Sequence, residues 1–303
     1  MSVREEAPLS APDVPFAGSM GKVRDRLADY AQLAKLRLSS MVVTTGVVGY
    51  WLGSTDILLS HLLWFTAGTL MIVAGANAFN QVIERRSDAR MARTAERPLP
   101  AGRVSVGEAR AVASVLSVAG LSLLFVSSGA LTAGLGLLAL ITYAWVYTPL
   151  KSRSSWSTVP GAIAGAIPPL MGWTAVQSEI TPFAWCLFGI VFFWQFPHTW
   201  AIAATYREDY EKAGYRAAPL RGTRLRTLTL TLALVAVSVV PAALGNTGTV
   251  YLVGACALGA LVLGAAFRFG DGVLRPQAVQ LLVVSLFYLP LLLALLAIDG
   301  KLV

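Results

Sequence analysis

The chain has 303 residues, of which 56% are hydrophobic and only 13% are charged. With a mean hydropathy of +0.65, it is too apolar for a soluble domain. The formal net charge of +8 comes from basic residues that lie beside apolar runs, so no nucleic-acid partner is needed to explain it. We therefore expect an all-α, polytopic membrane protein.

Seven charge-free runs divide the chain. Two of them, 111–150 and 227–267, are about twice the ~20 residues that one helix needs to cross a bilayer. Each has a turn-like centre, at 127–129 and at 245–248, so the sequence predicts a bundle of nine transmembrane helices. We expect residues 1–22, rich in Pro, Ser and Ala, to form a disordered cytoplasmic tail, and residues 23–303 to form a single nine-helix domain. The helices are expected at about 36–54, 62–83, 108–127, 131–148, 158–176, 182–203, 226–244, 249–267 and 277–297.

The basic residues predict the orientation of these helices. When nine spans alternate in direction, 23 of the 24 Lys and Arg residues fall on one side and only Lys301 falls on the other. Because loops rich in Lys and Arg stay in the cytoplasm, we expect a cytoplasmic N-terminus and an external C-terminus.

The first concentration of polar residues, at 77–103, begins inside the second expected helix and continues past its end. Asn80, Glu84 and Asp88 are spaced i, i+4, i+8, so on a helix the three side chains share one face within about 80°. Two carboxylates four residues apart repel each other, which predicts a cation between them. That cation is either Arg85, in a surface ion pair with Asp88, or Mg²⁺, which prefers oxygen ligands and commonly bridges to phosphates.

The second concentration of polar residues ends the sixth expected helix, at 192–214. His198 lies inside an uncharged stretch, where an ionisable group is a functional candidate; otherwise it bonds to a carbonyl freed by Pro197. Asp209 follows three helical turns later and faces the same cavity if the helix continues. Otherwise it belongs to a solvated acidic run that Arg207 balances. The neighbouring aromatic residues, among them Trp194 and Trp200, would suit either interfacial anchoring or the wall of a ligand pocket. Gln195 lies between them in the sequence.

These motifs resemble those of a known family. N-Q-x-x-E-x-x-x-D at 80–88 and M-x-R-T-x-x-R-P-L-P-x-G at 91–102 are similar to the first motif of the UbiA-type intramembrane prenyltransferases. More narrowly, YTPLKSR at 147–153 and W-Q-x-P-H-x-W at 194–200 resemble the haem-directed branch, the protohaem IX farnesyltransferases or haem O synthases. The likeness covers about residues 35–219.

Three positions depart from the family pattern. The wider superfamily usually has aspartate at Glu84, and many haem O synthases have another aspartate at Arg86. Quinone-directed relatives begin the second motif with aspartate at His198, whereas the haem-directed branch has histidine there. The last difference favours haem as the acceptor.

The resemblance implies a Mg²⁺-dependent transfer of farnesyl from farnesyl diphosphate to the 2-vinyl group of haem B, which yields haem O and diphosphate. The site would face the cytoplasm, in a bacterial cytoplasmic (inner) membrane, and haem A synthase or terminal oxidase assembly proteins would receive the product. The implied metal ligands are Asn80, Glu84, Asp88 and Asp209, with His198 as a further catalytic residue. The implied substrate-binding residues are Arg93, Arg97, Lys151, Arg207, Trp194, Gln195 and Trp200.

Three other functions are compatible with parts of the sequence. The same chemistry on a quinone precursor or a chlorophyll-type ring would require no histidine at 198. A transporter would place its polar groups near the bilayer midplane, whereas the carboxylates here cluster at the cytoplasmic rim. A haem-binding assembly factor would not need the shared face of Asn80, Glu84 and Asp88. For Lys151, the sequence also leaves open that the side chain only anchors and orients its helix at the membrane surface.

Overall fold

The computed structural model describes residues 15–215, 222–270 and 272–300. Every regular element in these ranges is helical, and seven helices are long and apolar enough to cross a membrane. This confirms the expected all-α, polytopic architecture. The elements are α1 (Pro15–Leu33), α2 (Leu36–Gly53), α3 (Leu59–Asp88), α4 (Val106–Ile141), η1 (Thr142–Tyr147), α5 (Thr148–Leu150), η2 (Ser155–Ser157), α6 (Thr158–Gln177), α7 (Pro182–Thr205), α8 (Arg207–Ala213), α9 (Thr223–Ala243), α10 (Thr249–Arg268) and α11 (Arg275–Asp299).

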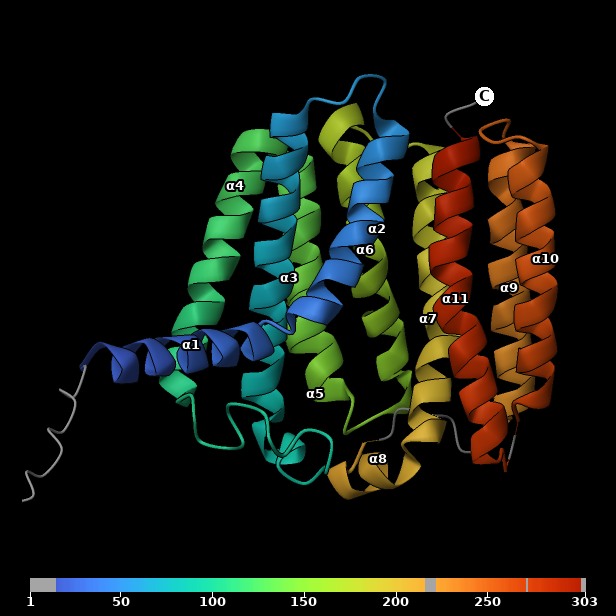
Figure 1. Ribbon diagram of the computed structural model, residues 1–303. Helices are drawn as coiled ribbons and strands as arrows, with labels where there is room; N and C mark the ends of the chain where they lie inside the picture. The colour runs from blue at the N-terminus through green and yellow to red at the C-terminus, as the bar shows by residue number, and fades with distance from the viewer. Residues whose placement is uncertain (1–14, 216–221, 271, 301–303) are drawn as a thin grey trace, which may run out of the picture.

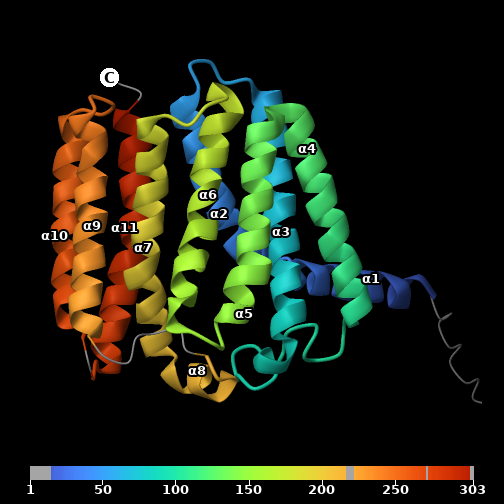
Figure 2. The ribbon, with the colours of Figure 1, turned by 180° about the vertical axis from the view of Figure 1, so that it is seen from behind.

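The difference between seven candidate spans and nine expected ones has two sources. The run Val106–Leu150 counts as one span of 45 residues, although Gly129 interrupts it with a non-helical backbone of φ 86° and ψ 173°. The chain turns back there, so that α4 continues into a second limb beside the first (Figure 2). The helix α2 lies where the first span was expected but is not among the seven. The count of nine spans stays a prediction.

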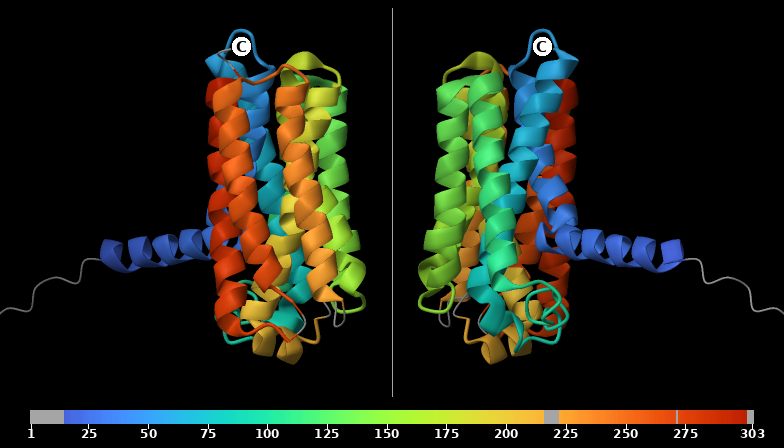
Figure 3. Two further views of the ribbon diagram at one scale, coloured as in Figure 1. Left: turned by 90° about the vertical axis from the view of Figure 1, so that its right-hand side faces the viewer. Right: turned by 90° about the vertical axis from the view of Figure 1, so that its left-hand side faces the viewer.

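The helix α1 begins at Pro15, inside the segment 1–22 that was expected to be a disordered tail. Proline suits the first turn of a helix because its missing N–H has no partner there anyway. The helix stands roughly perpendicular to the bundle and projects from its side (Figures 1 and 3). Residues 1–14 lie outside the described residues.

Glycine lets α2 and α6 approach closely. A Cβ atom built on Gly49 would lie 2.1 Å from the carbonyl oxygen of Pro169, and one on Gly172 would lie 1.9 Å from the carbonyl oxygen of Gly46. Only glycine fits such backbone contacts, as in many membrane helix pairs. These contacts pack α6 tightly against α2. Side chains of α6 belong both to the core shared with α7 and α9–α11 and to the core shared with α2–α4, so α6 joins the two halves.

Different segments of the chain lie at the two ends of the bundle. The loop 89–105 and α8 lie together at one end, whereas the α2–α3 connection and the end of α11 lie at the other (Figure 1). The Nη2 atom of Arg90 in that loop donates to the carbonyl oxygen of Ala213 in α8, at 3.4 Å. The fold thus brings the two polar segments of the sequence, four expected spans apart, to the same end.

Candidate active site

One face of α3 carries buried oxygen-bearing side chains. Asn80, Glu84 and Asp88 retain 1%, 6% and 0% of their accessible surface. The helix continues through Asp88, which confirms the expected shared face. Because burying a carboxylate away from water is costly unless it is paired, this face requires cations from elsewhere in the chain.

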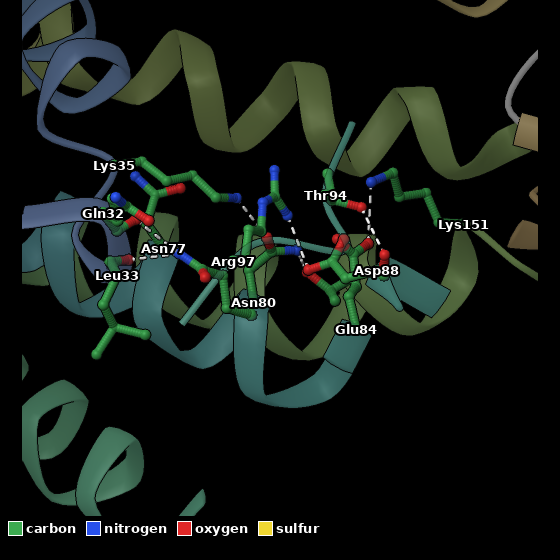
Figure 4. A network of polar contacts seen from close by, with 12 residues as sticks. Gln32, Leu33, Lys35, Asn77, Asn80, Glu84, Asp88, Thr94, Arg97 and Lys151 are labelled. Atoms are coloured by element: carbon green, nitrogen blue, oxygen red, sulfur yellow. Dashed lines mark hydrogen bonds and ion pairs between the residues drawn. The ribbon is translucent and has the colours of Figure 1, made fainter. Parts of the chain in front are cut away.

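Two basic residues supply that charge from separate segments. The Nζ atom of Lys151, just after α5, donates to Glu84 Oε1 at 2.9 Å. The Nη1 atom of Arg97, in the loop after α3, donates to Asp88 Oδ2 at 2.8 Å. Both cations reach over the α3 face from outside the helix (Figure 4). Both are among the substrate-binding residues expected from the sequence.

The local ion pair considered for Arg85 and Asp88 is wrong. Arg85 Nη1 donates to the carbonyl oxygen of Val82, one turn back along α3. Asp88 faces the inside of the bundle and is fully buried, so the side chain that reaches it comes from the folded loop and not from the exposed side of its own helix.

Lys35 is a third cation at this face, and its role was not predicted from the sequence. Its Nζ atom donates to Asn80 Oδ1 at 2.6 Å. It joins α1 to α2 in a left-handed conformation, with φ 47° and ψ 50°, which costs a non-glycine residue about 1–3 kcal/mol and is typical of functional sites. The Gln81 amide holds this turn by donating to the carbonyl oxygens of Gln32 and Leu33. The available signal was its position directly before the first apolar run.

Charge and burial set the protonation of these lysines differently. Burial, with a further contribution from Arg97, lowers the pKa of Lys35 to about 7. Burial is the largest single influence on Lys151 and acts to lower its pKa, but the Glu84 carboxylate and three nearby tyrosines together outweigh it and raise that pKa well above the ordinary value. Lys151 is therefore a fixed cation, whereas Lys35 is close to losing its proton.

Two tyrosines flank Lys151. Its Nζ atom lies 5.4 Å from the ring centroid of Tyr147 and 4.5 Å from that of Tyr215, within the range of cation–π attraction. Burial raises the pKa of Tyr215, so its phenol stays neutral. Tyr215 lies just after α8, so the second polar segment contributes directly to the surroundings of the first.

A π-helical turn, η1, shapes the wall opposite α3. Pro149 has no N–H to donate to the preceding turn, and wide turns of this kind often occur at functional sites. The hydroxyl of Thr148 donates to the carbonyl oxygen of Tyr143 at 2.8 Å and accepts from Asn80 Nδ2 at 3.0 Å. The turn is thereby tied to the α3 face. Neither Thr148 nor Tyr143 was recognised from the sequence.

One buried carboxylate oxygen of the cluster has no partner. Asp88 Oδ1 is buried and accepts no hydrogen bond within the part of the chain that the structure describes. Leaving a buried acceptor unpaired costs about 1–3 kcal/mol, and more when it is charged. The surrounding donor set of amide and carboxylate oxygens is the kind that Mg²⁺ selects, and a cation bound here would satisfy Asp88 Oδ1. The residues present therefore fit a divalent metal.

The helix does not continue from His198 to Asp209, so the condition for both side chains to face one cavity is not met. The helix α7 ends at Thr205, because Tyr206 has a non-helical backbone of φ −111° and ψ 37°, and α8 starts in a new direction. Asp209 is half-buried on α8. Among the described residues, no three His, Cys, Asp or Glu side chains are grouped so as to hold one metal ion, so Asp209 does not join Glu84 and Asp88.

Two other expected substrate-binding residues lie at the rim. Arg207 Nε pairs with Glu211 Oε1 at 2.8 Å on the exposed face of α8, where both side chains are more than half accessible. The guanidinium carbon of Arg93 lies 5.4 Å from the ring centroid of Tyr206. Neither arginine contacts the buried carboxylates.

A cavity of about 70 Å³ adjoins the polar cluster. Gln195 reaches it from α7 and donates through Nε2 to the carbonyl oxygen of Ala162 at 3.0 Å. A Cβ atom on Gly165 would lie 2.5 Å from Gln195 Oε1, so this glycine makes room for the amide. The cavity is lined by Tyr143, Tyr147, Thr158, Gly161, Ala162, Gln195 and Thr199, and its two tyrosines also border the α3 face.

The remaining residues of the second cluster face α11. His198 Nδ1 lies 2.9 Å from the Ser285 hydroxyl, so the bond expected from His198 to a carbonyl near Pro197 is replaced by one to a side chain 87 residues away. Trp194 stacks on His198, with ring centroids 4.4 Å apart, and donates through Nε1 to the carbonyl oxygen of Ser285. Trp200 is 5% exposed and packs in the core between α7 and α9–α11.

Comparison with known proteins defines the class to which this fold and site belong. Residues 42–288 match the model of the UbiA prenyltransferase family. The chain therefore belongs to this family and is a prenyltransferase, as the motifs at 80–88 and 194–200 implied.

Its relatives include proteins with one particular name. A protein from Solibacter usitatus named "Protoheme IX farnesyltransferase" is 39% identical over 288 residues, covering 90% of this chain and 99% of its own. One of the same name from Myxococcus xanthus is 40% identical over 282 residues, covering 90% and 94%. The resemblance to the haem-directed branch is thereby confirmed.

Solved structures share the fold at low sequence identity. A digeranylgeranylglyceryl phosphate synthase has a TM-score of 0.78 at 17% identity, covering 92% of this chain and 100% of its own. A UbiA homologue from Archaeoglobus fulgidus bound to GPP and Mg²⁺ has a TM-score of 0.60 at 16% identity, covering 88% and 99%. At such identities the likeness shows the fold alone.

Proposed function

We propose that this protein transfers the farnesyl group of farnesyl diphosphate to the 2-vinyl group of haem B, forming haem O and diphosphate. The observation that carries the proposal is the α3 face of Asn80, Glu84 and Asp88, which is buried, surrounded by cations and left with one unpaired carboxylate oxygen. It lies in a prenyltransferase whose relatives are named for this reaction.

The basic residues at the α3 face would bind the diphosphate. Lys151, Arg97 and Lys35 already converge on this face, and guanidinium and ammonium groups bind phosphate oxygens well. In the substrate complex they would exchange part of their contact with the carboxylates for the diphosphate. Arg93 and Arg207 would act at the rim, where they increase the local concentration of the anion.

Mg²⁺ would be held by Asn80, Glu84 and Asp88. Asp209, which is not grouped with them in this structure, would join as the acid of the second motif when the diphosphate is bound. Two contacts near the metal site support a role for the α8 segment, namely those from Arg90 to Ala213 and from Lys151 to Tyr215. When bound, the metal neutralises negative charge on the diphosphate. The protein's part is to keep these oxygens buried and oriented before the substrate arrives.

In the proposed reaction, the cations around the α3 face would stabilise the negative charge that develops on the departing diphosphate. The bond between C1 of farnesyl and the diphosphate oxygen breaks, and both electrons leave with the oxygen. The π electrons of the haem vinyl group form the new bond to C1, and water adds to the resulting cation on the porphyrin side and releases a proton. The aromatic residues that line the cavity beside the α3 face, Tyr143 and Tyr147, would keep other water away from the farnesyl cation.

The acceptor would be bound from the α7 side. Gln195 borders the cavity next to the donor site, and His198 with its stacked Trp194 faces α11. We assign these three residues to haem binding, with Trp200 as support for α7 from its core position.

We also propose nine membrane spans, with a cytoplasmic N-terminus, an external C-terminus and an active site that opens to the cytoplasm. The break at Gly129, the helix α2 and the segregation of basic residues support this topology. The bacterial relatives support a location in the bacterial inner membrane. Haem A synthase or terminal oxidase assembly proteins would then receive the product from the bilayer.

The function is tested by incubating the detergent-purified protein with haem B and farnesyl diphosphate, with and without Mg²⁺. The haems are then resolved by chromatography and mass spectrometry. We expect a Mg²⁺-dependent product with the mass of haem O. In parallel incubations, a quinone precursor or a chlorophyll-type ring replaces haem B. Mg²⁺-dependent prenylation of one of these, with no haem product, would overturn the acceptor while keeping the site.

A further inference from the structure

The Ser285 hydroxyl, on α11, makes two short contacts. Its Oγ atom lies 2.9 Å from the carbonyl oxygen of Leu282 and 2.9 Å from Nδ1 of His198. A serine hydroxyl carries one hydrogen, and a carbonyl oxygen can only accept. The proton on the line between Ser285 and Leu282 must therefore belong to the serine.

This assignment decides which ring nitrogen of His198 carries the proton. If the serine hydrogen is used toward Leu282, the hydroxyl can only accept from the imidazole, so Nδ1 must carry hydrogen. The opposite arrangement, in which Ser285 donates to Nδ1, would leave two acceptor oxygens 2.9 Å apart with no hydrogen between them. In the neutral ring one nitrogen donates and the other accepts, so Nε2 keeps its lone pair.

The neighbours of His198 hold the ring in this orientation. Trp194 stacks on the imidazole at an interplanar angle of 19°, and its own N–H bonds to the Ser285 carbonyl oxygen at 2.7 Å. One residue of α11 thus fixes both rings of α7. Within the described parts of the chain, Nε2 of His198 makes no hydrogen bond.

We infer that Ser285 is a positioning residue that holds His198 as the Nδ1–H tautomer, so that Nε2 is ready to ligate the iron of the haem acceptor. Neutral imidazole with a free nitrogen lone pair is the common protein ligand of haem iron, and a hydrogen bond to the other nitrogen sets its orientation and basicity. The inference rests on the proposed function for the identity of the acceptor. The tautomer itself does not depend on it.

A consequence is discrimination between iron and metal-free porphyrins. With an iron–Nε2 bond, haem B should bind more tightly than protoporphyrin IX, which has the same vinyl group and no metal. Ser285→Ala should remove much of this preference, by about 10-fold, as expected for the loss of a partner that orients a metal ligand. The KM for farnesyl diphosphate should stay unchanged, because Ser285 lies on the acceptor side.

The tautomer can be read directly because the chain has only two histidines. Protein labelled with ring-¹⁵N histidine is placed in lipid nanodiscs without substrate, and two-bond ¹⁵N–¹H correlations identify the protonated nitrogen of each ring. His61→Gln assigns the remaining signals to His198. We expect hydrogen on Nδ1 in the wild type and in Ser285→Thr, and a shift toward the Nε2–H form in Ser285→Ala.

A matched control is Ser238→Ala. Ser238 is a fully buried serine on α9 whose hydroxyl donates to Leu234 in the same way and contacts Tyr288 instead of a histidine. It should leave the His198 tautomer and the porphyrin preference unchanged. Hydrogen on Nε2 in the wild type, or an unaltered spectrum in Ser285→Ala, would overturn the inference even if haem O is formed. A confirmed tautomer without any haem product would instead refute the proposed function alone.

Discussion

Two polar networks, one buried and one half-buried, lie at opposite ends of this apolar bundle, and they differ in how completely their bonds are made. At the end where α2 connects to α3, both ring nitrogens of His61 are used, with Nδ1 3.0 Å from the Tyr50 hydroxyl and Nε2 3.2 Å from the Ser128 hydroxyl. At the opposite end, where α3 finishes, the network contains charged residues and leaves Asp88 Oδ1 without a partner in the described structure.

This difference separates a structural network from a functional one. The network of Tyr50, His61 and Ser128 joins α2, α3 and α4, contains no Asp, Glu, Lys or Arg, and uses both ring nitrogens of its histidine. A charged network with an unpaired acceptor retains free energy that binding can release. The two histidines illustrate the same contrast, because His61 uses both nitrogens and His198 uses only one.

The largest effect is expected for the α3 carboxylates. Asp88→Ala and Glu84→Ala should each lower haem O formation by roughly 10³-fold, since each removes a proposed metal ligand and the charge stabilisation that it would give the transition state. The rate is measured by chromatography of the haem product, and membrane insertion is checked by the yield of monodisperse protein. Wild-type turnover by either variant would contradict the assignment of that residue as a metal ligand.

Lys151→Met should lower kcat/KM for farnesyl diphosphate by about 10²-fold and the apparent free energy of unfolding by about 3–5 kcal/mol. It removes the partner of the buried Glu84 and leaves an uncompensated charge. Rates with varied farnesyl diphosphate and denaturation in mixed detergent micelles measure the two effects.

Arg207→Met is the matched control for Lys151→Met. Its ion pair with Glu211 is exposed, so the free energy of unfolding should change by no more than about 1 kcal/mol. If both variants lost activity equally, burial would not distinguish the basic residues that bind the diphosphate from those at the rim.

Mg²⁺ should stabilise the protein only by binding to the network of Asn80, Glu84 and Asp88. A single site saturated to 100 times its dissociation constant adds about 2.7 kcal/mol, which thermal unfolding with and without Mg²⁺ detects. Asp88→Asn should abolish the shift, whereas His61→Gln should preserve it. An equal shift in both variants would place the metal outside this network.

The smallest effect on activity is expected for the network around His61. His61→Gln should lower the free energy of unfolding by about 1–2 kcal/mol, because up to two net hydrogen bonds of about 1 kcal/mol are lost, and should leave turnover within about twofold. Chemical denaturation and the haem O assay measure these. A large loss of turnover with unchanged stability would contradict the assignment of this network as structural.

Within the first motif, the sequence alone determined the shared face of Asn80, Glu84 and Asp88, because positions four apart always align on a helix. It also determined the membrane class, the break near Gly129 and the family, since apolar run length and motif spacing are local properties. Lys151 and Arg97 were recognised as candidates from motifs, although spacing could not say which carboxylate each would meet.

Tertiary structure alone decided which cations and hydroxyls complete the site. Lys35 reaches Asn80 across 45 residues, and Ser285 reaches His198 across 87. Helical periodicity carries no information about contacts between helices, so it suggested Arg85 as the partner of Asp88 and a continuous helix from His198 to Asp209. The backbone of Tyr206 and the packing of the folded loop against α3 override both local patterns, because burying a charge requires a partner wherever the fold can supply one.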